Sequence, residues 1–175
     1  MTNVQNDYFE LFSLPEQFAV DTKLLEANFR KIQSSSHPDR FVNANATEKL
    51  ASMQLATLSN EAYGTLKNTA RRAKYLLEKQ GIDAVADTNT ALPLDFLMEQ
   101  MEWREQLEDA KVAKDIAAMD KLLRQLRTES KALERELASL FDDKKDYVTA
   151  TEVTRKLIFI DKVCSDIQQA IEYLD

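Results

Sequence analysis

The chain has 175 residues and a net charge of −7, with 44% hydrophobic and 30% charged residues. With two glycines and three prolines, and abundant Leu, Ala, Glu, Lys and Gln, it favours an all-helical fold. We find no apolar run near the roughly 18 residues that a bilayer span needs, and no secretory signal. The single Cys164 excludes an internal disulfide and favours a reducing compartment.

Apolar patterning predicts three helices in the first part of the chain, in the order short, medium and long. The short helix covers 7–12, the second covers 21–35 and the third covers 44–68. A fourth apolar segment follows and ends near Gly81, which suits a helix terminus. We therefore expect a small helical domain over residues 1–80.

The segment Ser36-His37-Pro38-Asp39-Arg40 lies between the second and third helices and holds the only histidine in the chain. Proline forbids its predecessor the helical conformation and has no N–H, so the helix must end near His37. We expect Asp39 to accept backbone N–H bonds as the chain turns, with both side chains presented at a loop tip. Taken alone, such a tripeptide fits a simple helix stop equally well.

The second part of the chain begins with a polar segment without periodicity, which we interpret as a linker over 81–93. Three long helical patterns follow at 94–111, 116–141 and 147–174. The connections between them are a few residues long, which favours antiparallel neighbours. The sequence therefore predicts a three-helix bundle over 94–175.

A heptad-like seam runs along the last helix through Val153, Leu157, Ile160 and the positions that continue their spacing, among them Cys164. We interpret Cys164 as a small packed side chain and not as a reactive thiol. Several apolar residues fall outside the predicted seams, which indicates either a partner surface or further packing. They are Leu97, Met98, Met101, Trp103, Ile158 and Phe159.

Charge is distributed unevenly, with a net of +1 in residues 1–80 and −8 in residues 81–175. Nucleic-acid binding is therefore disfavoured, because no strongly basic face is available to neutralise phosphates. We also expect no metal site and no cofactor, because one His and one Cys far apart supply too few ligands. The lone glycines Gly64 and Gly81 form no phosphate-binding loop, and no nucleophile accompanies His37 and Asp39, so we predict that the chain is not an enzyme.

The order of helices around His-Pro-Asp resembles the J-domain, the co-chaperone module that stimulates ATP hydrolysis by DnaK-class chaperones. Three further segments make the whole chain resemble the HscB family, the J-domain co-chaperones of bacterial iron–sulfur cluster assembly. They are Arg72-Ala73-Lys74-Tyr75-Leu76-Leu77, the segment from Phe96 to Glu105, and Arg155-Lys156-Leu157-Ile158-Phe159-Ile160-Asp161-Lys162. The resemblance implies two partners in the bacterial cytoplasm, the chaperone HscA and the cluster scaffold IscU.

The resemblance assigns the chaperone contact to the J-domain and the scaffold contact to the bundle. For the chaperone, we expect the turn and the basic residues of the preceding helix to face an acidic surface, with Asp39 accepting an arginine. These candidates are His37, Pro38, Asp39, Arg40, Arg30 and Lys31. For the scaffold, the resemblance implies an apolar centre with a polar rim. These candidates are Leu97, Met98, Met101, Glu102, Arg104, Glu105 and Phe159, while the role of Trp103 stays open.

Two alternatives remain at this point. One is a general J-domain co-chaperone that serves DnaK, and the other is a non-catalytic helical adaptor in which His-Pro-Asp is only a turn. Arg40 stands where J-domains usually have lysine, and Ser34-Ser35-Ser36 replaces a common aromatic, which predicts a weaker or more selective chaperone contact.

Overall fold

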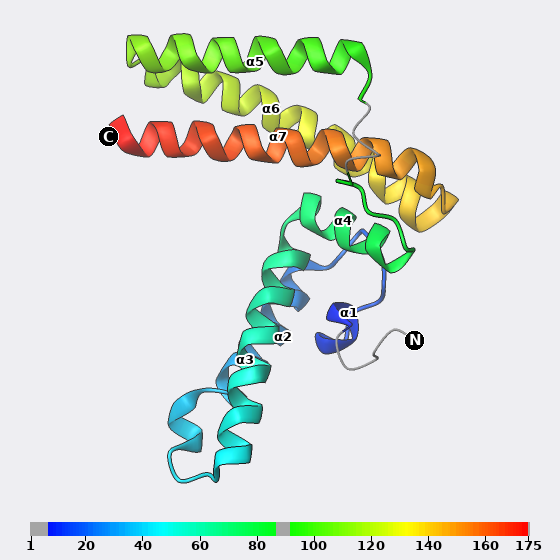
Figure 1. The fold of residues 1–175 in the computed structure, drawn as a ribbon, viewed down its shortest axis with the longest axis vertical. Helices are drawn as coiled ribbons and strands as arrows, with labels where there is room; N and C mark the ends of the chain where they lie inside the picture. The colour runs from blue at the N-terminus through cyan, green and yellow to red at the C-terminus, as the bar shows by residue number, and fades with distance from the viewer. Residues whose placement is uncertain (1–6, 87–91, 175) are drawn as a thin grey trace. The chain divides into compact units, whose positions relative to one another are not determined.

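The computed structural model describes residues 7–86 and 92–174, and these residues contain helices and no strand (Figure 1). The predicted all-α fold is therefore confirmed. The chain divides between Tyr75 and Leu76 into two compact units, earlier than the boundary that we expected after residue 80.

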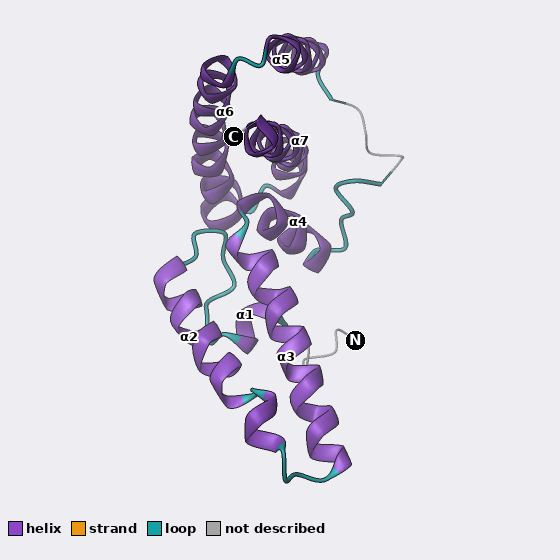
Figure 2. Cartoon of the chain, turned by 90° about the vertical axis from the view of Figure 1, so that its left-hand side faces the viewer, coloured by secondary structure: helices purple, strands orange, loops and turns teal. Residues whose placement is uncertain are grey.

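The first unit is a helical hairpin with a short helix packed against it (Figure 2). Helices α2 and α3 lie side by side and run in opposite directions, and the 3₁₀ turn η2 lies at the tip between them. This is the predicted J-domain arrangement with its His-Pro-Asp loop. The elements are α1 (Tyr8–Leu11), α2 (Thr22–Ser35), η2 (Pro38–Phe41), α3 (Ala46–Lys67) and α4 (Thr69–Lys79), which continues past the division.

Both long helices of the hairpin begin at a side-chain cap. The carboxylate of Asp21 accepts the backbone N–H groups of Lys23 and Leu24 at 3.1 and 3.0 Å. Asn45 and Glu48 form a reciprocal capping box at the start of α3. Each cap satisfies backbone donors that the first helical turn leaves unpaired. The sequence therefore fixes where α2 and α3 begin.

The Arg-Ala-x-Tyr segment of α4 holds the N-terminal part of the first unit in place. Tyr75 stacks on Tyr8, with ring centroids 4.5 Å apart, and its hydroxyl oxygen accepts the Tyr8 N–H at 3.1 Å. The guanidinium of Arg72 is buried, lies 5.0 Å from the Phe18 ring centroid and donates to the Leu66 carbonyl at 3.1 Å. These residues of the motif are therefore structural, because they cross-connect three segments of the core.

The second unit contains the predicted three-helix bundle. Helices α5 and α7 run in the same direction and α6 runs against both, with the most extensive contact between α6 and α7 (Figure 1). Buried residues of all three helices, at helical spacing along each, pack together in a core cluster. The elements are α5 (Leu94–Ala113), α6 (Ile116–Ala138), the π-helical η4 (Ser139–Lys144) and α7 (Tyr147–Leu174).

The end of α6 differs from the prediction of one helix reaching Phe141. The α-helical winding stops at Ala138 and continues as the π-helical turn η4. Leu140 and Phe141 are adjacent in sequence and both are buried. The wider winding changes the direction of successive side chains, which lets this adjacent pair enter the core together.

Part of the predicted linker 81–93 packs on the bundle. Ala84 is fully buried, and its carbonyl accepts a hydrogen bond from Nε of Arg155 at 2.8 Å. Residues 87–91 of that linker lie outside the described residues. Arg155 belongs to the last-helix motif, and this bond gives it a structural role within the second unit.

Candidate functional site

The His37 imidazole organises the turn at the tip of the hairpin. Its Nδ1 atom accepts the backbone N–H of Asp39 at 3.3 Å, which makes His37 the N-cap of η2. Helix α2 ends just before it, where the hydroxyl of the buried Ser36 donates to the Ile32 carbonyl at 2.8 Å. The serine run therefore closes the helix end with hydrogen bonds.

The expectation that the Asp39 carboxylate would accept backbone N–H bonds is wrong. The imidazole of His37 takes that role, and the carboxylate stays at the surface with 87% of its side chain exposed. Its Oδ2 atom lies 3.5 Å from His37 Nδ1. An exposed carboxylate held by a structured turn is available to accept an arginine from another protein.

The structure brings the other chaperone-site candidates into the same hairpin. Pro38 and Arg40 are exposed at the tip, and Arg30 and Lys31 are exposed on α2. Arg30 lies seven residues before His37, about 10 Å along the helix axis. It pairs with Glu26 at 2.6 Å, so part of its charge is already compensated within α2.

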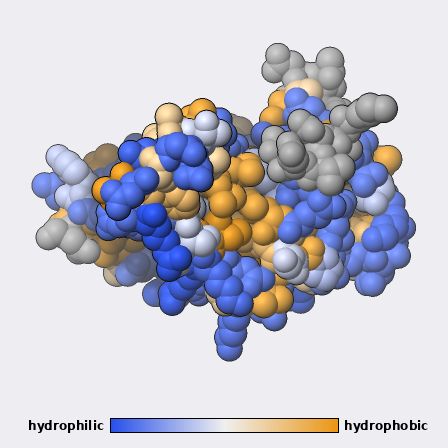
Figure 3. Space-filling view, turned by 90° about the horizontal axis from the view of Figure 1, so that it is seen from below, coloured by the Kyte–Doolittle hydropathy of each residue, from blue (hydrophilic) through white to orange (hydrophobic). Residues whose placement is uncertain are grey.

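The bundle exposes an apolar strip on α5, formed by Leu97, Met98 and Met101. Met101 protrudes most, with 71% of its surface accessible, while Phe96 and Trp103 point into the core. A strip of this kind costs free energy in water, which is regained when a partner covers it. Figure 3, a view from below, shows apolar areas among hydrophilic side chains on the surface of the molecule.

Trp103 belongs to the core, which answers the question that the sequence left open. It is 3% exposed and packs edge-on against Phe96, with centroids 5.8 Å apart. Phe159 is half-buried and packs against both rings, at 6.1 Å from Phe96 and 6.5 Å from Trp103. The three rings join α5 to α7.

The polar candidates on α5 do not all lie beside Phe159. The guanidinium of Arg104 lies 5.2 Å from the Phe159 ring centroid, a cation–π contact that places it on the α7 side of α5. Glu102 and Glu105 are exposed. At about 100° per residue, Glu102 lies on the opposite side of α5 from Arg104, so the predicted polar rim surrounds the apolar strip on both flanks.

Burial raises the pKa values of two titratable groups of the bundle, Cys164 and Glu129. Burial raises the pKa of the Cys164 thiol, with the nearby Asp161 carboxylate adding to the effect. Partial burial raises the pKa of Glu129, and the Glu99 carboxylate across the α5–α6 interface raises it further. Cys164 packs against the core of the bundle, as its position in the heptad-like seam of the last helix predicted.

Within the part of the chain that the structure describes, no cluster of three or more His, Cys, Asp or Glu side chains could hold a metal ion. None of the described helices is long and apolar enough to cross a membrane.

Comparison with known proteins agrees with this arrangement over the whole chain. Residues 92–168 match the family model described as the HSCB C-terminal oligomerisation domain. The chain is also 46% identical over 175 residues to a co-chaperone protein HscB homologue of Burkholderia thailandensis, covering 100% of this chain and 99% of that relative. This chain belongs to the HscB family.

Solved HscB structures have the same fold. The chaperone HscB from Vibrio cholerae superposes with a TM-score of 0.80 at 36% identity, covering 97% of this chain and 99% of that one. The human co-chaperone HscB superposes with a TM-score of 0.85 at 30% identity, covering 95% and 83% of the two chains. The J-domain and the three-helix bundle are therefore family features that this chain shares.

The sequence did not predict the position of every residue near the α5 strip. It did not decide whether Trp103 is buried or exposed. It also did not single out the lysines along α5 and α7 that line a groove beside Arg104. Helical spacing offered a signal for Trp103, because Phe96, Trp103, Leu107 and Ala110 recur on one face. No comparable signal marks the lysines, because their proximity depends on how two helices pack.

Proposed function

We propose that this HscB-family protein is a co-chaperone that binds the iron–sulfur scaffold IscU through its bundle and delivers it to the chaperone HscA. In this proposal, the His37-Pro38-Asp39 turn stimulates ATP hydrolysis by HscA, and cluster maturation and transfer follow from the chaperone cycle. We expect the protein to act in the bacterial cytoplasm and to activate an ATPase without being one.

One observation carries the proposal. Two exposed surfaces of different chemistry belong to two separate compact units of one chain. The hairpin tip presents a carboxylate and cations, which suits a charged partner surface. The α5 strip presents the exposed side chains of Leu97, Met98 and Met101, which suits a desolvated protein interface.

The test is the steady-state ATPase rate of HscA with IscU, measured with and without this protein and with its His37→Gln variant. We expect strong stimulation by the natural chain and none by the variant, whose helices are retained in circular dichroism. Stimulation that survives His37→Gln would contradict the role of the turn. Stimulation of DnaK and not of HscA would indicate a general J-domain co-chaperone.

A further inference from the structure

A groove runs between α5 and α7 from Arg104 toward the C-terminal ends of both helices. One part, of about 260 Å³, is lined by α5 residues from Arg104 to Lys111 and by Lys162, Val163 and Asp166 of α7. The next part, of about 460 Å³, extends to Tyr173 and Leu174. The two parts share Lys111 and Asp166, so the groove is continuous.

The groove is cationic although the bundle half of the chain is strongly acidic. Its lining carries four cations (Arg104, Lys111, Lys114 and Lys162) and two carboxylates (Glu108 and Asp166). Both carboxylates are already paired, Glu108 with Lys111 at 2.8 Å and Asp166 with Lys162 at 3.0 Å. Among the described residues, Arg104 and Lys114 have no ion-pair partner, so the excess positive charge lies at the two ends of the groove.

The floor of the groove is apolar. Leu107 and Val163 line its first part, and Ala170 and Leu174 line its second part. At the far end, Tyr173 is 90% exposed. From Arg104 to Lys114 the groove follows ten residues of α5, about 15 Å. That length accommodates roughly five residues of extended chain or about ten residues of helix.

The groove is continuous with the apolar strip of the bundle. Arg104 lines the groove, and it follows Met101 by three residues and Leu97 by seven, which puts it on the same side of α5 as these two residues of the strip. We propose that the α5–α7 groove binds an acidic segment with apolar anchors of the same scaffold protein that covers the α5 strip. This inference rests on the proposed function and extends the scaffold interface along α5 to Lys114.

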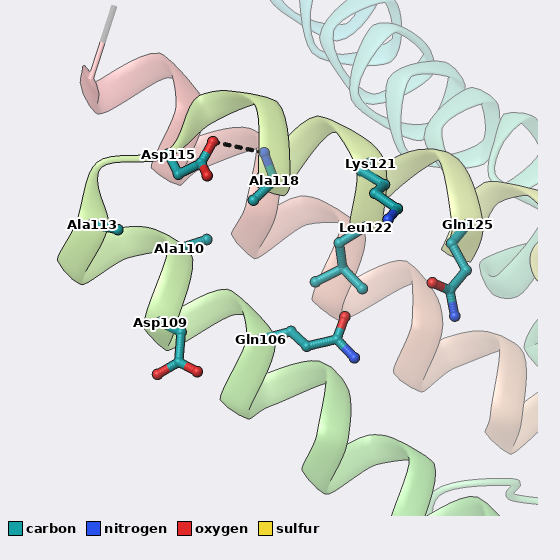
Figure 4. A pocket seen from close by; sticks show the side chains of 9 residues that line it. All are labelled: Gln106, Asp109, Ala110, Ala113, Asp115, Ala118, Lys121, Leu122 and Gln125. Atoms are coloured by element: carbon teal, nitrogen blue, oxygen red, sulfur yellow. Dashed lines mark hydrogen bonds between the residues drawn. The ribbon is translucent and has the colours of Figure 1, made fainter.

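A neighbouring groove between α5 and α6 differs in its chemistry (Figure 4). It has about 570 Å³ and is lined by amides, small residues, Lys121 and the carboxylates of Asp109 and Asp115. The Asp115 carboxylate caps α6 by accepting the Ala118 N–H at 2.9 Å. This lining has no excess of positive charge, so it offers no attraction to an acidic segment. A second copy of the chain is also disfavoured, because two-fold pairing of the cationic groove brings like charges together.

Lys114 and Lys145 provide a matched pair for the test. Both are exposed lysines that end a helical segment in the left-handed conformation, with φ of 51° and 54°. Lys114 lines the groove, whereas Lys145 follows η4 at the opposite end of the bundle (Figure 1). Lys→Gly at either position removes one charge and suits the left-handed backbone equally well, so stability changes alike in both variants.

The experiment measures the binding of purified IscU to the full chain and to Lys114→Gly, Lys145→Gly and Met101→Ala variants at low and high salt. We expect Lys114→Gly to weaken binding about three- to tenfold at low salt and less at high salt, with Lys145→Gly unchanged. Carbodiimide, which joins lysine amines to carboxylates, should link Lys114 or Lys111 to IscU carboxylates and leave Lys145 unlinked.

Each other outcome has a distinct meaning. Equal binding by Lys114→Gly and Lys145→Gly, with Met101→Ala weakened, would overturn the groove inference and leave the proposed function standing. Failure of the natural chain to bind IscU would overturn both. A dimer that dissociates on Lys114→Gly substitution, measured by sedimentation, would assign the groove to a second copy and overturn its role in scaffold binding.

Discussion

The Nδ1 atom of His37 accepts the backbone N–H of Asp39 at 3.3 Å, so the histidine is the residue that shapes the turn. To accept this bond, Nδ1 must carry no proton, which leaves the ring proton on Nε2. The Asp39 carboxylate is thereby left at the surface and takes no part in holding the turn. We therefore propose different roles for the two residues: His37 shapes the turn, and Asp39 recognises the chaperone.

Asp39→Asn should therefore abolish stimulation of the chaperone ATPase while the turn keeps its shape. The amide keeps the size of the carboxylate but loses the charge that an arginine of the partner would pair with. Steady-state ATPase assays measure the loss, and IscU binding to the same variant should stay unchanged. A parallel loss of both activities would argue against two separate sites.

Met101→Ala should weaken scaffold binding by about 2 kcal/mol if this side chain is a central anchor. The stability of the protein should change by less than about 0.5 kcal/mol, because Met101 is exposed. Isothermal titration with IscU and denaturant unfolding measure the two quantities. Val148→Ala, in the first turn of α7 and also exposed, is the control that should leave both unchanged.

Phe159→Ala should affect both quantities, because this ring is half-buried against Phe96 and Trp103. We expect a loss of about 2 to 3 kcal/mol in unfolding free energy, below the cost for a fully buried phenylalanine. Binding should weaken as well, since Arg104 loses the ring on which it stacks. An unchanged unfolding midpoint would show that the aromatic cluster contributes little to the bundle.

Glu129→Gln should stabilise the bundle at neutral pH. Partial burial and Glu99 raise the Glu129 pKa above its usual value of 4.5, so the folded state binds a proton more tightly than the unfolded state. Stability therefore falls as pH rises from about 4.5 through the folded pKa, and the full penalty persists above it. Urea unfolding at several pH values should show a smaller decline for the variant, while a decline identical to that of the natural chain would contradict this account.

The Cys164 thiol should react slowly with iodoacetamide near neutral pH. Burial raises its pKa, so the thiolate that reacts is scarce, and packing against the core limits access. Mass spectrometry measures the rate of labelling, with the same protein in urea as the control. Labelling as fast in the native protein as in urea would show that the seam opens around Cys164.

The sequence by itself determined the helices, the turn and the family. Proline after His37, the caps at Asp21 and Asn45, and the helical spacing of apolar residues act locally, so their consequences follow from neighbours along the chain. The same spacing identified four of the eight buried residues of α7, namely Val153, Leu157, Ile160 and Ile167. It did not identify which of the surplus apolar residues are exposed.

Tertiary structure decided what depends on packing between helices. Trp103 and Met101 are two residues apart on α5, yet one is 3% and the other 71% exposed. Phe159 stacks on Trp103 because α7 lies alongside α5. The same packing places Lys111, Lys114 and Lys162 along one groove. Sequence spacing gives the face of a single helix, whereas the neighbour that covers this face is fixed only when the helices assemble.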